Sequence, residues 1–548
     1  NDLYVRFYRM AERRIVEGTG KGIVCFISNY SWLDGLSHPG MRERYLEVFD
    51  RIWIDSLNGD KYRTGKTTPE GKPDPSIFST PMNPEGIQVG TAIALMVRRE
   101  VHLGVEAIHF RDIWGKGKWD VLREDAEGKW TPVDYVDVTP SVELGYPFRP
   151  LDTGVDYFDW PRLPELFPVS FPGVKTSRDA ALVEIDREKL VARMETYFDP
   201  EVSDEEIARI APALMRSASR FNAEAVREHL IKRKEGFLRD NVVHYLYRPF
   251  DLRCVYWEPE TKLLDEKRAD YFPQVFEGNA FLFTTGRTRK TVEPALFTRR
   301  LNDLNCMDSG ARGFPLLLKE QGLFADLETE PRPNLSDDAR AYLDRLGAEP
   351  EDLFYHALAV LHAPAYREEN AGALRQDWPR VPLPASLDAL QASATLGRRV
   401  AALLDPEEPV PGVTTGAIRP GLKALAAVSH VRDEPLDPAQ GDLAVTAGWG
   451  YLVRGDVTMP GQGRLVEIET AAGPAVDVYL NEVAYWHNVP QAVWDYTLGG
   501  YPVLKKWLSY REEKVLGRAL KPEEVRAFTA IARRIAAILA LHPALDGS

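Results

Sequence analysis

Gly22-Ile-Val-Cys-Phe-Ile-Ser28 is an uninterrupted apolar run that ends abruptly in Asn29-Tyr-Ser-Trp-Leu-Asp-Gly35. This pattern is typical of a buried strand that carries polar and aromatic side chains at its carboxyl end. Two similar runs, Arg51 to Ser56 and Gln88 to Val97, predict two more strands. Only one helical segment, Leu3 to Glu17, precedes the first strand. The sequence therefore predicts part of an open α/β sheet, completed by polypeptide outside this chain, with its ligand site at the carboxyl edge.

The rest of the chain predicts a mixture of helices and strands. Helices are expected at 41–49, 186–198, 204–237, 352–363 and 522–541, strands at 243–257, 281–285 and 313–318, and hairpins within 441–483. The segment 58–86 is rich in glycine and proline, which predicts an irregular loop. A loop of that length inside a compact domain is usually functional or disordered. The predicted fold class is α/β, a partial Rossmann-like sheet followed by a mixed α/β region.

Composition and charge narrow the function classes only slightly. The chain has 548 residues, 44% of them hydrophobic, and a formal net charge of −14. No apolar run approaches the roughly 20 residues that span a bilayer, and no signal peptide is evident, so we expect a cytoplasmic protein without a membrane partner. Three widely separated cysteines and histidines without ligand spacing predict no metal site. The acidity does not exclude a local basic cleft, because charges are screened beyond about 10 Å.

Several groups of basic residues stand out from this acidic background. Between residues 283 and 313, six positive side chains face three negative ones. The candidate nucleic-acid-binding residues are Lys61, Arg63, Lys66, Lys175, Arg178, Arg287, Arg289, Lys290 and Arg312. Each could bind a phosphate or a guanine edge, and each could equally be a solvated surface group.

Longer segments resemble a known family. The stretches 1–15, 22–35 and 86–95 resemble the part of an adenine-specific DNA methyltransferase that follows its catalytic tetrapeptide. Five further stretches resemble the carboxyl-terminal half of type ISP restriction–modification enzymes: Gly173-Val-Lys-Thr-Ser-Arg-Asp179, Tyr247-Arg-Pro-Phe-Asp-Leu-Arg253, 354–367, Trp378-Pro-Arg-Val-Pro382 and Gly499-Gly-Tyr-Pro-Val-Leu-Lys-Lys-Trp-Leu508.

This resemblance implies a domain organisation and a set of partners. Residues 1–150 would be the carboxyl-terminal half of a methyltransferase domain, 151–395 a target-recognition domain, and 396–548 a mixed β and helical part of the specificity region. The implied partners are double-stranded DNA, the missing amino-terminal methyltransferase half, and a nuclease and helicase in the same restriction or phage-defence system. The implied cofactor of the intact enzyme is S-adenosylmethionine.

The chain lacks the catalytic and cofactor-binding motifs of this family. The family's Asn-Pro-Pro-Tyr motif and its glycine-rich cofactor turn are missing, and the sequence contains no Pro-Pro dipeptide. No catalytic residue is therefore assigned. The resemblance implies only a position, with Asn29, Tyr30 and Trp32 at the edge of the pocket that receives the extruded base. The turn 284–290 and Arg312 would read bases, while Lys61, Arg63 and Lys66 would hold the backbone.

Two alternatives remain open on the sequence. One is a stand-alone specificity or adaptor chain without catalysis, whose sheet is completed by a partner protein. The other is a carbohydrate-binding or carbohydrate-active protein, suggested by twelve tryptophans and the acidic charge. A carbohydrate-active enzyme would need two carboxylates roughly 5–9.5 Å apart in an aromatic cleft, a feature that the sequence does not indicate.

Overall fold

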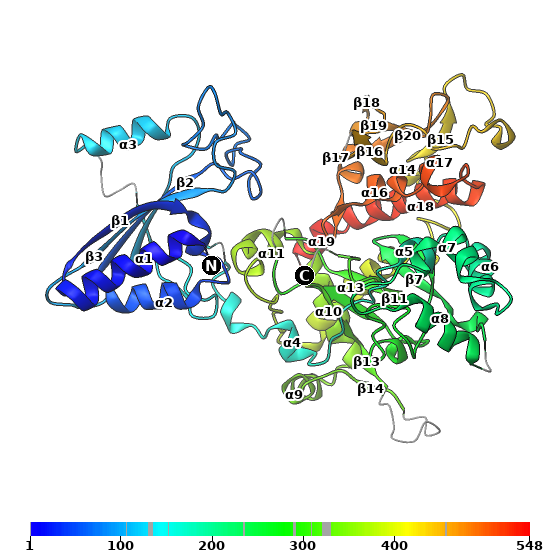
Figure 1. The fold of residues 1–548 in the computed structure, drawn as a ribbon, viewed down its shortest axis with the longest axis horizontal. Helices are drawn as coiled ribbons and strands as arrows, with labels where there is room; N and C mark the ends of the chain where they lie inside the picture. Colours follow the sequence, from blue (N-terminus) through cyan, green and yellow to red (C-terminus); the bar gives the residue numbers. More distant parts are fainter. Residues whose placement is uncertain are drawn as a thin grey trace. The chain divides into compact units, whose positions relative to one another are not determined.

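The protein forms two compact units in a computed structural model (Figure 1). Unit 1 comprises Asn1–Gly154 with the short segments Arg287–Thr291 and Glu369–Asp377, and unit 2 comprises Val155–Gly286, Val292–Glu368 and Trp378–Ser548. The structure describes residues 2–105, 107–129, 135–151, 153–233, 236–288, 292–307, 310–319, 330–454 and 457–547. The predicted α/β fold class is confirmed.

Unit 1 is built on one five-stranded sheet with the order β1-β3-β2-β4-β5. Its strands are β1 (Gly22–Asn29), β2 (Arg51–Asn58), β3 (Thr91–Arg98), β4 (Ile108–Asp112) and β5 (Val136–Val138). β3 runs antiparallel to both β1 and β2, and β4 is parallel to β2. The carboxyl ends of β1, β2 and β4 therefore meet at one edge of the sheet. The three strands predicted at 22–28, 51–56 and 88–97 are confirmed.

Two helices, α1 (Leu3–Arg13) and α2 (Pro39–Val48), share one buried core with the sheet. Val24, Ile54 and Met96 point from neighbouring strands into this core and are almost fully buried. The helical segment predicted at 3–17 is confirmed, because α1 is followed directly by a π-helical segment over Arg14–Thr19. Unit 1 also contains α3 (Lys118–Ala126) and α12 (Ala371–Leu374).

On the sheet face opposite to this core, the apolar side chains of β1 remain exposed. Ile23 is 63% exposed and Ile27 is 47% exposed. Their partners on β3, Val97 and Ile93, are half-buried. Among the residues that the structure describes, β1 pairs only with β3, so its outer edge carries unpaired backbone groups. An edge strand of a soluble protein is usually blunted or covered, and an apolar sheet face is usually packed against other polypeptide.

Unit 2 holds several small sheets of mixed type. A four-stranded sheet has the order β11-β7-β8-β6, a three-stranded sheet the order β10-β9-β12, and a second four-stranded sheet the order β15-β20-β19-β18. The strands are β6 (Val183–Glu184), β7 (Val242–Arg248), β8 (Asp251–Tyr256), β9 (Phe281–Thr284), β10 (Leu296–Thr298), β11 (Leu301–Asn302), β12 (Arg312–Pro315), β13 (Leu317–Leu318), β14 (Arg332–Pro333), β15 (Ala427–His430), β16 (Tyr451–Arg454), β17 (Val457–Pro460), β18 (Leu465–Thr470), β19 (Gly473–Tyr479), β20 (Ala484–Pro490), β21 (Thr497–Leu498) and β22 (Tyr501–Pro502).

The helices of unit 2 differ from the predictions at one place. They are α4 (Leu163–Leu166), α5 (Asp179–Leu182), α6 (Arg187–Phe198), α7 (Asp204–Ile210), α8 (Ala223–Lys232), α9 (Asp337–Leu346), α10 (Pro350–His362), α11 (Pro364–Glu369), α13 (Leu387–Leu404), α14 (Pro420–Lys423), α15 (Gln491–Trp494), α16 (Val503–Ser509), α17 (Glu513–Leu516), α18 (Pro522–Leu539) and α19 (His542–Asp546). The single helix predicted at 204–237 is wrong. Pro212 starts a separate 3₁₀ turn, and Asn222 accepts a hydrogen bond from the Ala225 N–H to begin α8.

A long apolar helical region at the carboxyl end is a core element of unit 2. The stretch Pro522–Asp546 is long and apolar enough to cross a membrane by length and composition alone. Its residue Phe528, however, is fully buried and stacks on Trp486 of β20, with ring centroids 3.9 Å apart, and also contacts Trp507 of α16. The apolar stripe of α18 is thus satisfied inside the unit, as in the core helix of a globular protein.

A buried histidine should make the stability of unit 2 sensitive to acid. His362 is fully buried at the end of α10, and its Nε2 donates to the Ala295 carbonyl at 2.7 Å, which fixes the tautomer. Burial, helped by the charge of Arg367, lowers the pKa of His362 to about 3. Below pH 6.5 the unfolded chain takes up a proton that the folded chain refuses, so stability falls as the pH drops.

We expect this histidine to cost about 2 kcal/mol of unfolding free energy between pH 7 and pH 5, at about 1.4 kcal/mol per pH unit below 6.5. Urea unfolding at both pH values should show that loss in the wild type and a smaller loss in His362→Gln. His229→Gln, an exposed residue of α8, is the matched control. Equal pH dependence in wild type and His362→Gln would contradict the assignment.

Candidate nucleic-acid interface

The chain that follows β1 folds back into the core of unit 1 and does not extend into solvent. The Asn29 side chain accepts a hydrogen bond from the Ser31 N–H at 2.7 Å and starts a 3₁₀ turn over Tyr30–Leu33. This turn buries Trp32 among Tyr8, Tyr45 and Phe148. Trp32 is 0% exposed, so it supports the edge from behind and does not itself line an open surface. Its predicted place beside an extruded base remains a prediction.

Two arginines pack over Tyr30 at this edge. The Arg63 guanidinium lies 5.2 Å from the Tyr30 ring centroid and the Arg149 guanidinium 5.4 Å from it. Arg63 binds both oxygens of Asp34, at 2.8 and 2.9 Å, and Arg149 lies 3.6 Å from the same carboxylate. Burial alone would raise the pKa of Asp34, but the hydrogen bonds and charge of Arg63 hold it below its ordinary value. The side chains of Arg63, Arg149 and Asp34 thus cover the carboxyl end of β1, and the bidentate Arg63–Asp34 pair fixes their geometry.

The glycine- and proline-rich loop between β2 and β3 is irregular, as predicted, but it is firmly anchored. One Asp60 oxygen accepts from the N–H groups of Tyr62 and Arg63, at 2.6 and 2.7 Å, and the other from Gly90 N–H at 2.9 Å. The buried Asp74 pairs with the equally buried Lys118 at 2.7 Å. Asp74 also accepts from the Gly59 and Gly115 N–H groups. These two carboxylates close both ends of the loop.

The anchored loop presents apolar side chains to solvent. Met82 is 98% exposed and Tyr62 is 65% exposed. The Tyr62 hydroxyl donates to the Gln88 side chain at 2.6 Å, which fixes the ring. Exposed apolar side chains on a rigid loop at the ligand edge of a sheet are the kind of group that proteins insert between base steps.

The predicted basic residues of this loop are already paired. Lys61 lies 3.3 Å and Lys66 3.8 Å from Glu85, and Lys66 also donates to the Glu85 carbonyl. Arg63 is bound to Asp34 as described. Surface lysine–carboxylate pairs contribute only about 0–1 kcal/mol, so a phosphate could replace Glu85 as partner. The pairing of Arg63 is stronger, because it is bidentate and partly buried.

The predicted basic residues of unit 2 have mainly structural contacts. Arg178 is buried, donates to the carbonyls of Lys262 and Leu263, and lies 3.7 Å from the Phe221 ring centroid. Arg312 donates to the hydroxyl and carbonyl of Ser170.

The remaining predicted residues are more exposed or lie outside the description. Lys175 pairs with Asp265 at 2.8 Å and is 38% exposed. Arg287 is exposed. Arg289 and Lys290 lie outside the described residues.

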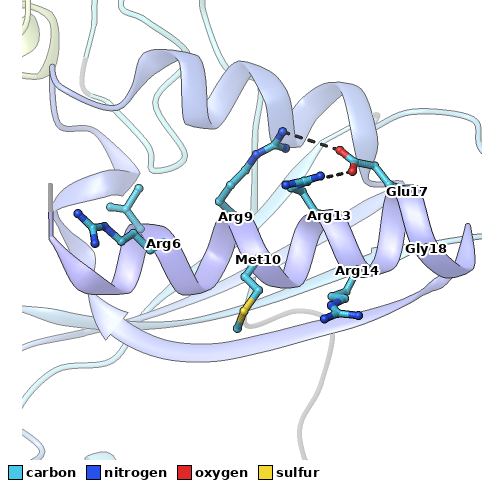
Figure 2. A pocket seen from close by; sticks show the side chains of 8 residues that line it. Arg6, Arg9, Met10, Arg13, Arg14, Glu17 and Gly18 are labelled. Carbon is cyan, nitrogen blue, oxygen red and sulfur yellow. Dashed lines mark hydrogen bonds and ion pairs between the residues drawn. The ribbon is translucent and has the colours of Figure 1, made fainter.

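A further basic surface, which was not predicted from the sequence, lies on the outer side of α1. A shallow pocket of about 780 Å³ lies there, lined by Val5, Arg6, Arg9, Met10, Arg13, Arg14, Glu17 and Gly18. Figure 2 shows the side chains that line it. Glu17 binds Arg13 at 2.9 Å and lies 3.9 Å from Arg9. Leu3, Phe7 and Met10 are exposed on the same helix. A spacing of three to four residues would have indicated this apolar stripe.

The described residues contain no group of three or more histidine, cysteine, aspartate or glutamate side chains that could hold a metal ion. Sequence reasoning also missed Asp60, Asp74 and Arg149. Gly59 lies 15 residues before Asp74, Gly90 lies 30 residues after Asp60, and Asp34 lies 115 residues before Arg149, so the fold and not the local sequence brings these partners together.

The sequence model of the Type ISP C-terminal specificity domain matches residues 165–535, more than half of the chain. The chain belongs to this family. No curated protein matches it by sequence.

Three solved structures resemble this Type ISP family member along nearly its whole length. The ATP-dependent Type ISP restriction–modification enzyme LlaBIII bound to DNA matches with a TM-score of 0.63 and 17% identity, over 99% of this chain and 34% of that one. The DrdV–DNA complex matches with a TM-score of 0.61 and 21% identity, over 100% and 52%.

A nuclease-deletion mutant of the Type ISP enzyme LlaGI, in complex with a DNA substrate mimic, matches with a TM-score of 0.58 and 19% identity, over 100% and 47%. The chain thus spans about a third to a half of the length of these structures, and the likeness establishes the shared fold.

Proposed function

We propose that this chain recognises and clamps duplex DNA for a restriction–modification enzyme. The observation that carries the proposal is the match of residues 165–535 to a specificity-domain family, together with the likeness of the whole chain to structures solved with DNA. Specificity in such a chain would come from side chains that read base edges, each good bidentate pair contributing about 1–3 kcal/mol of discrimination. The anchored loop of unit 1 would act on the duplex near the reacting base.

We further propose that unit 1 is half of an adenine methyltransferase domain. Its three parallel strands with an antiparallel β3 inserted between β1 and β2, its open β1 edge and its bare apolar face all support a sheet that continues into other polypeptide. Such a segment would pair with the β1 edge and cover Ile23 and Ile27 on one side and Leu3, Phe7 and Met10 on the other. The extruded adenine would then lie between the two halves.

The described residues do not fit S-adenosylmethionine. At the carboxyl edge, Arg63 and Arg149 both bind Asp34 over Tyr30, so this acidic group is not available for the cofactor's hydroxyls. The glycine-rich turn that would hold the cofactor is likewise missing from the sequence. We therefore assign this chain positioning and recognition, and we expect the methyl donor site on the completing polypeptide.

The two alternative functions, an adaptor chain without catalysis and a carbohydrate-binding protein, predict different features. An adaptor chain without catalysis would have its sheet completed by a separate partner protein that carries no methyl donor site. A carbohydrate-binding protein would need accessible tryptophans, yet Trp32, Trp449 and Trp486 are fully buried. These three tryptophans pack in the core and give no support to sugar binding, whereas Trp119 is 60% exposed.

The decisive experiment for DNA recognition is the salt dependence of binding to labelled duplex. We expect the logarithm of the association constant to fall linearly with the logarithm of salt concentration, with a slope of about −3 or steeper, since each phosphate contact contributes about −0.9. A flat salt dependence, or thermal protection by oligosaccharide and not by DNA, would overturn the proposal. Methyl transfer would be tested with tritiated S-adenosylmethionine, comparing this chain alone with the completed enzyme.

A further inference from the structure

The loop between β2 and β3 contains a tight turn whose two central residues are Pro81 and Met82. On either side of them, Thr80 and Asn83 bind each other in both directions, each N–H donating to the other residue's carbonyl at 3.0 Å. Asn83 also accepts from the Gly86 N–H, through its carbonyl and through its side chain, both at 3.2 Å. Backbone hydrogen bonds therefore fix the chain on both sides of Met82.

The residues that follow the turn pack closely against those that precede it. Gly86 has a positive φ of 55°, and a β-carbon there would lie 2.8 Å from the Ser79 backbone nitrogen, so no side chain fits between the two segments. The Lys66 ammonium donates to the Glu85 carbonyl and lies 3.8 Å from the Glu85 carboxylate, which Lys61 approaches at 3.3 Å. Two lysines thus balance the charge of Glu85, the acidic residue closest in sequence to Met82.

Hydrogen bonds connect the base of this loop to the chain that follows β1. The Lys61 N–H donates to the Gln88 carbonyl at 2.8 Å, and Asp60 accepts from the Gly90 N–H at 2.9 Å. The Gly90 carbonyl in turn accepts from the Tyr30 N–H at 3.0 Å. A β-carbon at Gly90 would lie 2.3 Å from the Tyr30 ring, so the loop backbone packs directly on that ring. The turn that carries Met82 is therefore held in a fixed position relative to Tyr30.

Met82 projects from the turn as a single apolar side chain. It is 98% exposed and Pro81 beside it is exposed, whereas Phe78 and Ile87, before and after the turn, are only 40% and 42% exposed. A standard protein–protein interface buries about 800 Å² on each partner, far more than one projecting side chain supplies. Proteins that kink DNA, by contrast, insert single apolar residues such as methionine or proline between base steps. The shape and chemistry of the turn therefore favour DNA as its partner.

We propose that Met82, supported by Pro81, is a wedge that inserts between two base pairs of the bound duplex. The inference rests on the proposed function of DNA recognition and adds the contact that opens the base stack. Unstacking costs free energy, which the burial of an apolar side chain between the bases partly offsets. Because the turn is already fixed, little backbone entropy remains to be lost on insertion. A base next to an opened step also needs less free energy to rotate out of the duplex.

The test uses a duplex that the wild-type chain selects from a pool of random sequences. The fluorescent adenine analogue 2-aminopurine, which brightens when it is unstacked, replaces each adenine of that duplex in turn. With saturating wild-type protein, we expect the fluorescence to rise several-fold at one base step. Met82→Gln keeps the side-chain length but makes it polar, so it should return the signal to that of the free duplex. Met82→Leu, the matched apolar variant, should retain the rise, and all three proteins should have the same Tm.

Oxidation of methionine gives an independent measure of the contact. Hydrogen peroxide converts accessible methionine to its sulfoxide, and mass spectrometry of peptides follows the rate at each position. Bound duplex should slow the oxidation of Met82 several-fold. Met10, which is 55% exposed on α1, is the internal control and should be oxidised at the same rate with and without the duplex.

The outcomes separate this inference from the proposed function. If the wild type selects no duplex, the proposed function fails and the wedge fails with it. If a duplex is selected but no position brightens, or the brightening persists in Met82→Gln, only the wedge is overturned. Slower oxidation of Met82 without any brightening would indicate a contact with the outside of a groove and would also overturn it. Equal oxidation of Met82 with and without duplex would place this turn outside the DNA interface.

Discussion

Replacing Arg42 by methionine is expected to unfold unit 1 or bring it close to unfolding. Arg42 is fully buried between α2 and the chain that follows β1. Its guanidinium donates to the carbonyls of Trp32 at 2.7 Å, Gly35 at 2.8 Å and Gly145 at 2.7 and 3.0 Å. Burial lowers the pKa of Arg42 to about 10, so the group is still charged at neutral pH.

The size of the effect follows from the carbonyls left behind. Methionine fills much of the arginine volume but donates no hydrogen bond, so the buried Trp32 carbonyl and the half-buried Gly35 and Gly145 carbonyls lose a charged partner, although Gly35 keeps the His38 N–H. A hydrogen bond to a charged group contributes about 1.5–3 kcal/mol, which gives a loss of about 4 kcal/mol or more. Domains are typically stable by only about 5–15 kcal/mol, so this loss is a large fraction of the total.

Hydrogen exchange followed by mass spectrometry can localise this loss. Peptides covering 22–35 and 141–149 should lose protection in Arg42→Met, while peptides of unit 2 should keep theirs. Arg6→Met, on the exposed side of α1, is the matched control and should leave both unchanged. Arg42→Lys should fall in between, because one ammonium cannot span three carbonyls as the planar guanidinium does. Unaltered protection in Arg42→Met would contradict this role.

Replacing Gly397 by valine is expected to separate α10 from α13. A β-carbon at Gly397 would lie 1.8 Å from the Tyr355 carbonyl oxygen and 2.6 Å from its carbonyl carbon. These are backbone atoms of α10, so no side chain can move aside to make room. At Gly397, α10 and α13 therefore approach so closely that no side chain fits between them.

Gly397→Ala is expected to lower the stability, whereas glycine to alanine usually raises it inside a helix. In an exposed helix interior, glycine to alanine stabilises by about 0.5–1 kcal/mol. Here the helices must shift, and overpacking costs about 1–3 kcal/mol or more, so Gly397→Ala should destabilise unit 2. Valine adds two γ-methyl groups, and we expect a loss of at least about 3 kcal/mol.

Urea unfolding followed by circular dichroism would measure both variants. Ala392→Val is the matched control, because it introduces the same side chain on the exposed face of the same helix. Its expected cost is only about 0.5 kcal/mol of helix propensity. A higher unfolding midpoint in Gly397→Ala than in the wild type would contradict the close approach.

Three of the five strands of unit 1 could be predicted from the sequence, whereas β4, β5 and the order of the strands could not. Apolar runs ending in polar residues correctly indicated β1, β2 and β3. The insertion of β3 between β1 and β2 is a matter of long-range pairing, which a local pattern does not encode. The same limit applies to the loop after β2, since Asp74 is fixed by Lys118, which lies 44 residues later.

The basic residues show why a charge count is a poor guide to a binding site. Arg178 and Arg312 were selected for their charge, yet each holds together segments that are distant in sequence. Arg248 and Arg253 lie in the stretch Tyr247–Arg253, and the contacts of their guanidinium groups with tyrosine rings are visible only in three dimensions. The sequence identifies the positively charged side chains, but only the fold shows which groups they contact.

The open edge of β1 also affects how the chain behaves when it is prepared by itself. A row of unpaired backbone groups is a template for strand addition between molecules, and soluble proteins usually blunt such edges with lysine, proline or a bulge. β1 (GIVCFISN) has no lysine or proline, and it pairs with β3 without a bulge. Mutual repulsion from the net charge of −14 opposes this self-association, and added salt weakens that repulsion. We therefore expect the isolated chain to aggregate through residues 22–29 as ionic strength rises, and a polypeptide that covers this edge to keep it in solution.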